Sequence, residues 1–260
     1  MESDEPMQAL RASLTPMFGE GYYRHSHFKR LKMPSRTSVA TEGLVKNNLA
    51  ERLRKEILCG TLKPGERIVE GKWASRFEVA QASIREAINI LAQAGFVTKA
   101  PGRSAQVIHL GESDVAHIYR VRGALEGLAA RLAVETRASL SELQGTMDIM
   151  RETAGSGDRE RLLEYDLLFH LQLCELSGNP CLIEHARRIL VPFFAFVAMR
   201  VSTSGQSSAA WEKDLEAHQR IIDLLREGEG ETAEMYVTKA MERFAKTAYD
   251  YWVNRSEHAR

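Results

Sequence analysis

Ionisable side chains interrupt the apolar faces of three helical segments in the carboxyl-terminal half of the chain. Asp166 and His170 stand one helical turn apart within a leucine-rich stripe, and His218 lies in a similar stripe on a later segment. Arg122 falls in the middle of an earlier stripe. An unpaired charge is costly to bury, so these groups are expected to pair with one another, with a metal or with a ligand. The pattern predicts a polar pocket in which Arg122 binds an anionic group, and in which Asp166, His170 and His218 hold a metal or hydrogen-bond a ligand.

Other interpretations of this cluster stay open. A closed internal network would pair Arg122 with Asp166 and leave both histidines as satisfied core residues. A metal-dependent helical-bundle enzyme could use an Asp/His/His cluster for hydrolysis, although the sequence has no phosphate-binding glycine loop, nucleophile elbow or HExxH helix. A metal-binding bundle protein is the third alternative, but it would not need the basic segment that precedes the cluster.

That basic segment is the second group of residues with chemical potential. The chain has a formal net charge of zero, yet residues 40–110 carry 11 Lys/Arg against 7 Asp/Glu, whereas residues 111–260 carry 18 against 24. This asymmetry indicates different partners for the two halves, with an anionic one such as DNA for the first. The residues expected to contact DNA are Lys72, Gln81, Ser83, Arg85, Lys99 and Arg103.

The elements that would position these residues are short. Val45, Leu49, Leu53 and Ile57 recur every four residues, and with the shift in pattern at Leu44 they predict a first helix that ends at Gly60. Two amphipathic segments follow, with stripes over 69–77 and 84–91 and almost nothing between them. Two β-rich runs then flank Pro101-Gly102 and predict a hairpin.

This order of helix, helix, tight turn, helix and hairpin is that of a winged helix-turn-helix. A short corner holds the third helix across the second, so that its first residues can enter a DNA major groove. Periodicity alone would also fit a small structural core without a DNA-binding role, but the basic residues at the hairpin favour DNA binding.

The rest of the chain is predicted to be a helical bundle. Apolar stripes mark six segments, over about residues 112–136, 139–154, 159–177, 180–200, 207–227 and 231–253. Within SGNP (177–180), glycine suits a helix end and proline suits the next helix start. The sequence therefore predicts a mainly α protein with a flexible extension over 1–40, a winged helix-turn-helix over 41–110 and an all-helical bundle over 111–260. The basic stretch at 27–32 in the extension is either a solvated tail or an added phosphate contact.

The cysteines and the apolar runs bear on location. The chain has an odd number of cysteines without metal-ligand spacing, at Cys59, Cys174 and Cys181. The amino terminus lacks the apolar stretch of a signal peptide. The longest apolar run, 189–197, is far shorter than the roughly 18 residues of a membrane span. We expect a cytoplasmic protein with no membrane partner.

The stretch LRKEILCGTLKPGERIVEGKWASRFEVAQASIREAINILAQAGFV contains a G-x-L-x-P-G-E-R turn, an I-R-E-A-I helix and an A-G-F-V exit, and a P-x-R wing follows it. Through these motifs the first half resembles the DNA-binding domain of the GntR family of bacterial transcription regulators. Two departures stand out. Where the family usually has Ser-Arg-Thr-Pro, this chain has Ala80-Gln81-Ala82-Ser83, so Gln81 replaces an arginine, and Ser104 replaces the usual wing glycine.

The second half resembles the ligand-sensing domain of the FadR subfamily, through RVRGALEGLAARLA, YDLLFHLQLCELSGNP and EAHQRIIDLLREGE. The resemblance implies a divalent metal of the Zn, Ni or Mn class, held by one Asp and three His, that binds a small carboxylate. Asp166, His170 and His218 match three of those positions. Ala240, or Phe244 one turn later, stands where the fourth ligand is expected, so a metal-free pocket for an organic acid or a larger ligand also stays open.

Together these features predict a DNA-binding transcription regulator rather than an enzyme. A small anionic metabolite in the helical domain would control operator binding. Because one short helix reads few base pairs, we expect a homodimer on a palindromic operator in double-stranded DNA.

Overall fold

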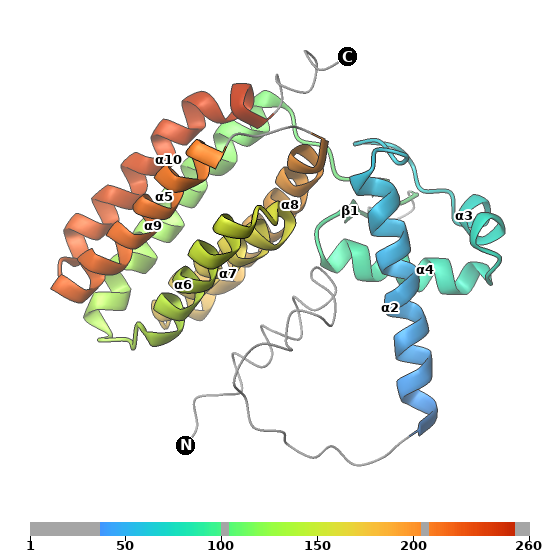
Figure 1. The fold of residues 1–260 in the computed structure, drawn as a ribbon, viewed down its shortest axis with the longest axis horizontal. Coiled ribbons are helices and arrows are strands. Elements are labelled where there is room, and N and C mark those ends of the chain that lie inside the picture. Colours follow the sequence, from blue (N-terminus) through green and yellow to red (C-terminus); the bar gives the residue numbers. More distant parts are fainter. Residues whose placement is uncertain (1–36, 100–103, 204–207, 253–260) are drawn as a thin grey trace. The chain divides into compact units, whose positions relative to one another are not determined.

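The computed structural model describes residues 37–99, 104–203 and 208–252. The chain forms two compact units, divided between His109 and Leu110 (Figure 1). Among the described residues, the amino-terminal unit contains three helices and a short hairpin, and the carboxyl-terminal unit contains helices alone. The mainly α architecture predicted from the sequence is confirmed.

The predicted flexible extension over 1–40 lies mostly outside the described residues, as does its basic stretch at 27–32. Its last four residues instead belong to helix α2 (Thr37–Leu58), which begins before the predicted start at Leu44. Leu49, Leu53 and Ile57 of the predicted stripe are buried. The four-residue spacing therefore identified the core face of this helix.

Helices α3 (Glu70–Phe77) and α4 (Gln81–Gln93) form the helix-turn-helix. From α3, Trp73 and Phe77 turn inward, with ring centroids 5.3 Å apart in an edge contact. The inward face of α4 is fully buried at Ile84 and Ile88. These two apolar faces lock the helices together and leave the opposite face of α4 exposed.

The corner between α3 and α4 depends on one residue in a left-handed conformation. Glu78 has φ 57° and ψ 46°, a region that costs a residue other than glycine roughly 1 kcal/mol or more. The Val79 N–H donates to the Ala74 carbonyl at 3.0 Å and closes the last turn of α3. Ala80 is extended, and α4 begins at Gln81. The chain thus passes from α3 to α4 within three residues.

The hairpin after α4 consists of two short antiparallel strands. Val97 of β1 (Val97–Thr98) pairs with Val107 of β2 (Gln106–Val107), and Arg67 adds an isolated bridge to Gln106. Residues 100–103, at the tip of the predicted hairpin, lie outside the described residues.

The carboxyl-terminal unit contains the six predicted helical segments. Gly157, at φ 76°, ends one of them, and Gly178, at φ 62°, separates another from the helix that starts at Pro180, which matches the boundary predicted at SGNP. The helices are α5 (Glu112–Glu135), α6 (Ser141–Ser156), α7 (Arg159–Leu176), α8 (Pro180–Thr203), α9 (Ser208–Glu227) and α10 (Gly230–Trp252).

Helices α5 and α10 pack along one another (Figure 1). Two glycines of α5 permit the close approach. A Cβ on Gly127 would lie 2.7 Å from Thr238 Oγ1 and 3.0 Å from the Glu234 carbonyl oxygen, and one on Gly123 would lie 3.2 Å from Met241 Cβ. The Thr238 hydroxyl also donates to the Gly123 carbonyl at 3.2 Å.

No helix in the described ranges is both long enough and apolar enough to span a bilayer.

Candidate functional site

Two of the expected DNA-contacting residues are joined to a carboxylate on α3. Arg85 Nη2 lies 2.9 Å from Glu70 Oε2, and Gln81 Nε2 donates to the same oxygen at 3.2 Å. Hydrogen bonding from Arg85 lowers the pKa of Glu70. The Arg85 side chain remains 54% exposed, so its outer face is accessible to a phosphate.

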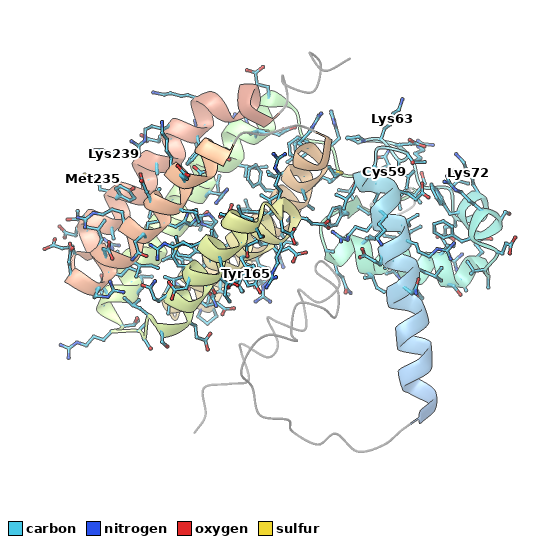
Figure 2. The ribbon with its side chains drawn as sticks, in the orientation of Figure 1. Cys59, Lys63, Lys72, Tyr165, Met235 and Lys239 are labelled. Carbon is cyan, nitrogen blue, oxygen red and sulfur yellow. The ribbon has the colours of Figure 1, made fainter. Side chains whose placement is uncertain are left out.

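The other expected DNA contacts differ in their surroundings. Lys72 projects from α3 into solvent (Figure 2), and Ser83 is half-buried in the first turn of α4. Lys99 follows β1, and its Nζ donates to Asn89 Oδ1 of α4 at 2.6 Å. This bond ties the base of the hairpin to α4. Arg103 lies outside the described residues.

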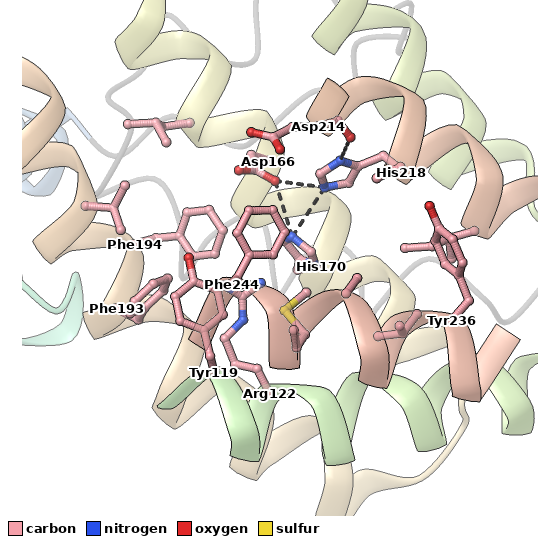
Figure 3. Close-up of a pocket in the computed structure, with 17 residues that line it drawn as sticks. Tyr119, Arg122, Asp166, His170, Phe193, Phe194, Asp214, His218, Tyr236 and Phe244 are labelled. Carbon is pink, nitrogen blue, oxygen red and sulfur yellow. Dashed lines mark hydrogen bonds and ion pairs between the residues drawn. The ribbon is translucent and has the colours of Figure 1, made fainter. Parts of the chain in front are cut away.

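A cavity of about 70 Å³ lies within the helical unit (Figure 3). Arg122, Asp166, His170 and His218 all line it, so residues from three helices that are far apart in the sequence meet there. Aromatic and aliphatic side chains make up most of the remaining wall: Tyr119, Leu163, Phe193, Phe194, Val197, Ala217, Ile221, Tyr236, Val237, Ala240, Met241 and Phe244.

Three potential metal ligands converge on one side of the cavity. Asp166 Oδ1 lies 3.0 Å from His218 Nε2 and 3.3 Å from His170 Nε2, and the two Nε2 atoms are 3.3 Å apart. Ligand atoms about 2.1 Å from one metal, at angles of about 90 to 109°, are separated by roughly 3.0 to 3.4 Å. The triangle therefore has the dimensions of one face of a metal coordination shell.

The outer nitrogen of each imidazole is engaged in the way a metal site requires. His218 Nδ1 lies 2.6 Å from the Asp214 carbonyl oxygen, and His170 Nδ1 lies 2.6 Å from Glu126 Oε2. Both oxygens can only accept, which favours a proton on each Nδ1 and an electron pair on each Nε2 of a neutral ring. The contact of His218 is a hydrogen bond, whereas that of His170 is a close ion-pair contact without well-directed hydrogen-bond geometry. Three electron-pair donors then face one another, and Asp166 Oδ1 is buried without a well-formed hydrogen bond among the described residues. The residues present fit a divalent cation.

Arg122 does not pair with Asp166, so that detail of the closed-network interpretation is wrong. Its Nε donates to Glu126 Oε1 at 2.7 Å, one turn along α5, and Glu126 connects onward to His170. The guanidinium lies 5.2 to 5.3 Å from the ring centroids of Tyr119, Phe193 and Phe194. These rings offer no acceptor for bidentate hydrogen bonding, and Arg122 borders the cavity beside them.

The pKa values in this cluster follow from its burial and charges. Burial acts to raise the pKa of Glu126, but Arg122 and His170 outweigh it and lower the pKa to about 2. The two imidazoles likewise outweigh burial at Asp166 and hold its pKa well below the ordinary value. For His170, burial acts to lower the pKa, and Glu126 outweighs it, so the pKa is raised.

Two acidic residues of this site were missed in the sequence. Glu126 is 1% exposed and links Arg122 to His170, and its four-residue spacing from Arg122 was the signal that could have identified it. Asp214 lines the cavity one turn before His218. Burial and the nearby Asp166 raise the pKa of Asp214 to about 6.

The fourth ligand position of the resemblance is occupied by apolar side chains. Ala240 and Phe244 both line the cavity from α10. The Phe244 ring stacks on Tyr119, with centroids 5.7 Å apart and planes 19° from parallel. The described residues that can act as metal ligands here form a three-residue group.

Comparison with known proteins agrees with both halves of this architecture. Residues 45–107 match the model of the bacterial regulatory proteins of the gntR family, and residues 117–243 match the FCD domain. An uncharacterised helix-turn-helix transcriptional regulator of Bacillus subtilis, YdhC, is 30% identical over 194 residues, which cover 72% of this chain and 83% of that protein. The chain belongs to the GntR family.

Other members of the GntR family are similar along most of this chain. A probable repressor of a D-xylose utilization operon, from Paenarthrobacter nicotinovorans, is 28% identical over 80% of this chain and 87% of its own length. The solved structure of Escherichia coli McbR/YncC has the same fold, with a TM-score of 0.61 and 22% identity over 80% of this chain and 98% of that one. This GntR-family protein is a DNA-binding transcription regulator with an FCD ligand-sensing domain, and the relatives found are transcription regulators rather than enzymes.

Proposed function

We propose that this GntR-family regulator binds a palindromic operator as a homodimer, and that a small organic acid, bound in the FCD cavity with a divalent metal, controls that binding. The exposed first turn of α4 and the adjoining hairpin would contact DNA. Support comes from Arg85 and Gln81, which are exposed on α4 beside its buried stripe. A homodimer would present two such helices to a two-fold symmetric site.

The observation that carries the effector proposal is the position of Arg122 beside the ligand triangle. Asp166, His170 and His218 would hold the metal, and Arg122 and the remaining coordination positions would bind a carboxylate. When bound, a divalent ion would supply positive charge and Lewis acidity at this point. The guanidinium would contribute bidentate hydrogen bonds that the aromatic wall cannot replace.

The charges of the cavity favour an anion when metal is present. With His170 protonated, two positive charges, on Arg122 and His170, balance the two carboxylates Glu126 and Asp166. Replacement of the His170 proton by a divalent ion raises the net charge of the cavity by one, whether or not Asp214 is protonated. Anion binding should therefore depend on metal.

The size of the cavity favours a small effector. Its volume of about 70 Å³ corresponds to roughly five to seven water molecules at 10 to 15 Å³ each. An organic acid of a few carbon atoms matches this volume better than a large ligand such as an acyl-coenzyme A.

Metal content provides the first test. Protein purified without chelator should contain about one divalent ion per chain, by elemental analysis, and His218→Ala should lose most of it because a three-residue site has no spare ligand. His185→Ala, which alters an exposed histidine of α8, serves as the control. A full complement of metal in His218→Ala would contradict this ligand set.

The effector is tested by screening small carboxylates for release of DNA, with and without chelator. We expect at least one acid to change operator affinity in metal-loaded protein and to lose its effect after chelation. An equal effect in both states would contradict the proposed role of the metal.

Phosphate contact by α4 is tested through the salt dependence of DNA binding. Arg85→Ala should weaken operator binding and reduce the slope of log K against log salt by roughly 0.9 for each lost phosphate contact, or about 1.8 in a dimer. An unchanged slope would contradict the placement of Arg85 at the phosphate backbone.

A further inference from the structure

The Glu70 carboxylate connects α3 to the reading face of α4. Both of its oxygens accept from Arg85 Nε, at 3.1 and 3.2 Å, and Oε2 also accepts from Arg85 Nη2 at 2.9 Å and from Gln81 Nε2 at 3.2 Å. The Glu70 side chain is 26% exposed. One residue at the start of α3 therefore holds two of the three side chains of α4 that were expected to contact DNA.

This contact fixes the orientation of the Gln81 amide. A side-chain amide next to a carboxylate must turn its nitrogen toward the carboxylate, because the amide oxygen is also an acceptor and the carboxylate would repel it. The amide nitrogen has two hydrogens, and Glu70 takes one of them. The groups left for another partner are one acceptor, Oε1, and one N–H donor.

One acceptor next to one donor matches a single base in the major groove. Adenine presents the N6 amine as donor and N7 as acceptor, whereas guanine presents two acceptors, O6 and N7. A freely turning glutamine could direct both of its N–H groups at guanine, but an amide held by Glu70 cannot. The arginine that is usual in the family at this position would instead favour guanine.

We propose that Glu70 is a positioning residue that sets the base preference of this regulator, by locking Gln81 in the orientation that reads adenine. The inference rests on the proposed operator binding through α4. It goes further in assigning specificity to a residue of α3 that need not touch DNA itself. The same carboxylate occupies one edge of the Arg85 guanidinium, which leaves the opposite edge for a phosphate.

The experiment is selection of duplexes from a random pool by the full-length protein. Gln81→Ala identifies the position that Gln81 reads, as the one position in each half-site where base preference is lost. At that position the wild type should prefer adenine over guanine by roughly tenfold or more, the range of a bidentate contact. Glu70→Ala should reduce this preference to within about threefold. It should leave the base preference at the other positions unchanged, because the Arg85 guanidinium that is released together with the amide is expected to contact a phosphate rather than a base.

Two further variants separate orientation from charge and from folding. Glu51→Ala removes a carboxylate from a comparable ion pair, with Arg54 at 2.9 Å on α2, and should keep the adenine preference. Glu70→Gln preserves the size of the side chain and can either donate or accept, so it should relax the preference as Glu70→Ala does.

Each contrary result has a distinct meaning. Adenine preference that persists in Glu70→Ala and Glu70→Gln would overturn the positioning role. Loss of preference at all positions in those variants would show a general structural role instead, and would overturn it equally. A Gln81→Ala variant that selects the wild-type sequence would show that Gln81 reads no base. A wild-type protein that selects no sequence would overturn the proposed operator binding itself.

Discussion

At the scale of single residues, one arginine of the helical unit is buried with an incomplete set of hydrogen-bonding partners. Arg122 is buried, and among the described residues its hydrogen-bonding partner is Glu126, reached through Nε. Three aromatic rings provide cation–π attraction but no bidentate acceptor. An anion in the cavity would complete the set, which is why we assign Arg122 to effector binding.

Substitution of Arg122 by lysine tests that assignment. We expect Arg122→Lys to keep the fold and operator affinity, because lysine can retain the charge beside Glu126, and to reduce effector-dependent DNA release about tenfold or more, because lysine lacks the planar fork. Arg131→Lys changes a half-buried arginine of the same helix that pairs with Glu234 at 3.3 Å, and this variant should respond normally. A full effector response in Arg122→Lys would remove this residue as the anchor.

The acidic residue Glu175 offers a pH-dependent prediction away from the cavity. Burial raises the pKa of Glu175 to about 7, even though Arg187 lies 3.4 Å away. Since the folded-state pKa exceeds the unfolded one, the folded protein binds the extra proton between about pH 4.5 and 7, and the stabilisation is lost as pH rises through about 7.

Glu175→Gln should therefore gain stability relative to the wild type as pH rises from 5 to 8. The gain should be on the order of 1 to 2 kcal/mol, measured by urea unfolding at both pH values. Glu184→Gln, which breaks an exposed pair with Arg188, should change stability by less than about 1 kcal/mol at either pH. A pH-independent difference for Glu175→Gln would contradict the raised pKa.

At the scale of elements, the contact between α5 and α10 shapes the cavity. Tyr119 and Arg122 line the cavity from α5, the helix that contains Gly123 and Gly127, and Phe244 lines it from α10. The two glycines bring the helices close enough for Phe244 to stack on Tyr119. A change in the distance between α5 and α10 should alter both the stability of the unit and the shape of the cavity.

Gly127→Ala tests the importance of this close approach. The added methyl group would meet the Glu234 carbonyl oxygen at 3.0 Å, so α10 must shift, at a cost of about 1 to 3 kcal/mol that outweighs the helix propensity gained. Gly145→Ala on α6 has open space around it and should stabilise the protein by roughly 0.5 to 1 kcal/mol. Thermal or urea unfolding of both variants measures the contrast, and equal stabilisation by both would show that the contact is not tight.

At the scale of the whole molecule, one winged helix-turn-helix unit and one FCD unit occur in each chain. A single α4 reads only a few base pairs, so affinity and specificity should depend on two chains acting on one duplex. The distance between the two half-sites of the operator should then affect the affinity of the dimer for DNA.

Half-site spacing tests the dimer. Using an operator obtained by selection, we expect removal of one half-site to weaken binding about 100-fold or more, and insertion of five base pairs to do similar harm because the half-sites turn to opposite faces of the helix. Gel-shift titration measures both, with analytical ultracentrifugation as the independent measure of dimer formation. Equal affinity for one and two half-sites would contradict a dimeric reader.

Much of this architecture was accessible from the sequence, because helices and their core faces follow local periodicity. Four-residue spacing identified the buried stripe of α2, and glycine and proline marked the boundary between α7 and α8. The start of α2 was placed too late, since its first turns lack a regular apolar stripe. The inward positions of Arg122, Asp166, His170 and His218 followed from the same spacing.

The pairing of those side chains was decided by tertiary structure alone. Periodicity assigns a residue to a face of its own helix but does not say which residue of another helix it meets. The closed-network interpretation paired Arg122 with Asp166, but Arg122 bonds Glu126, which in turn reaches His170. Likewise, nothing local relates Glu70 to Gln81, 11 residues later. The sequence by itself determined the elements and their buried faces, whereas the contacts between elements, which set charge and orientation in both sites, depend on how the helices pack in three dimensions.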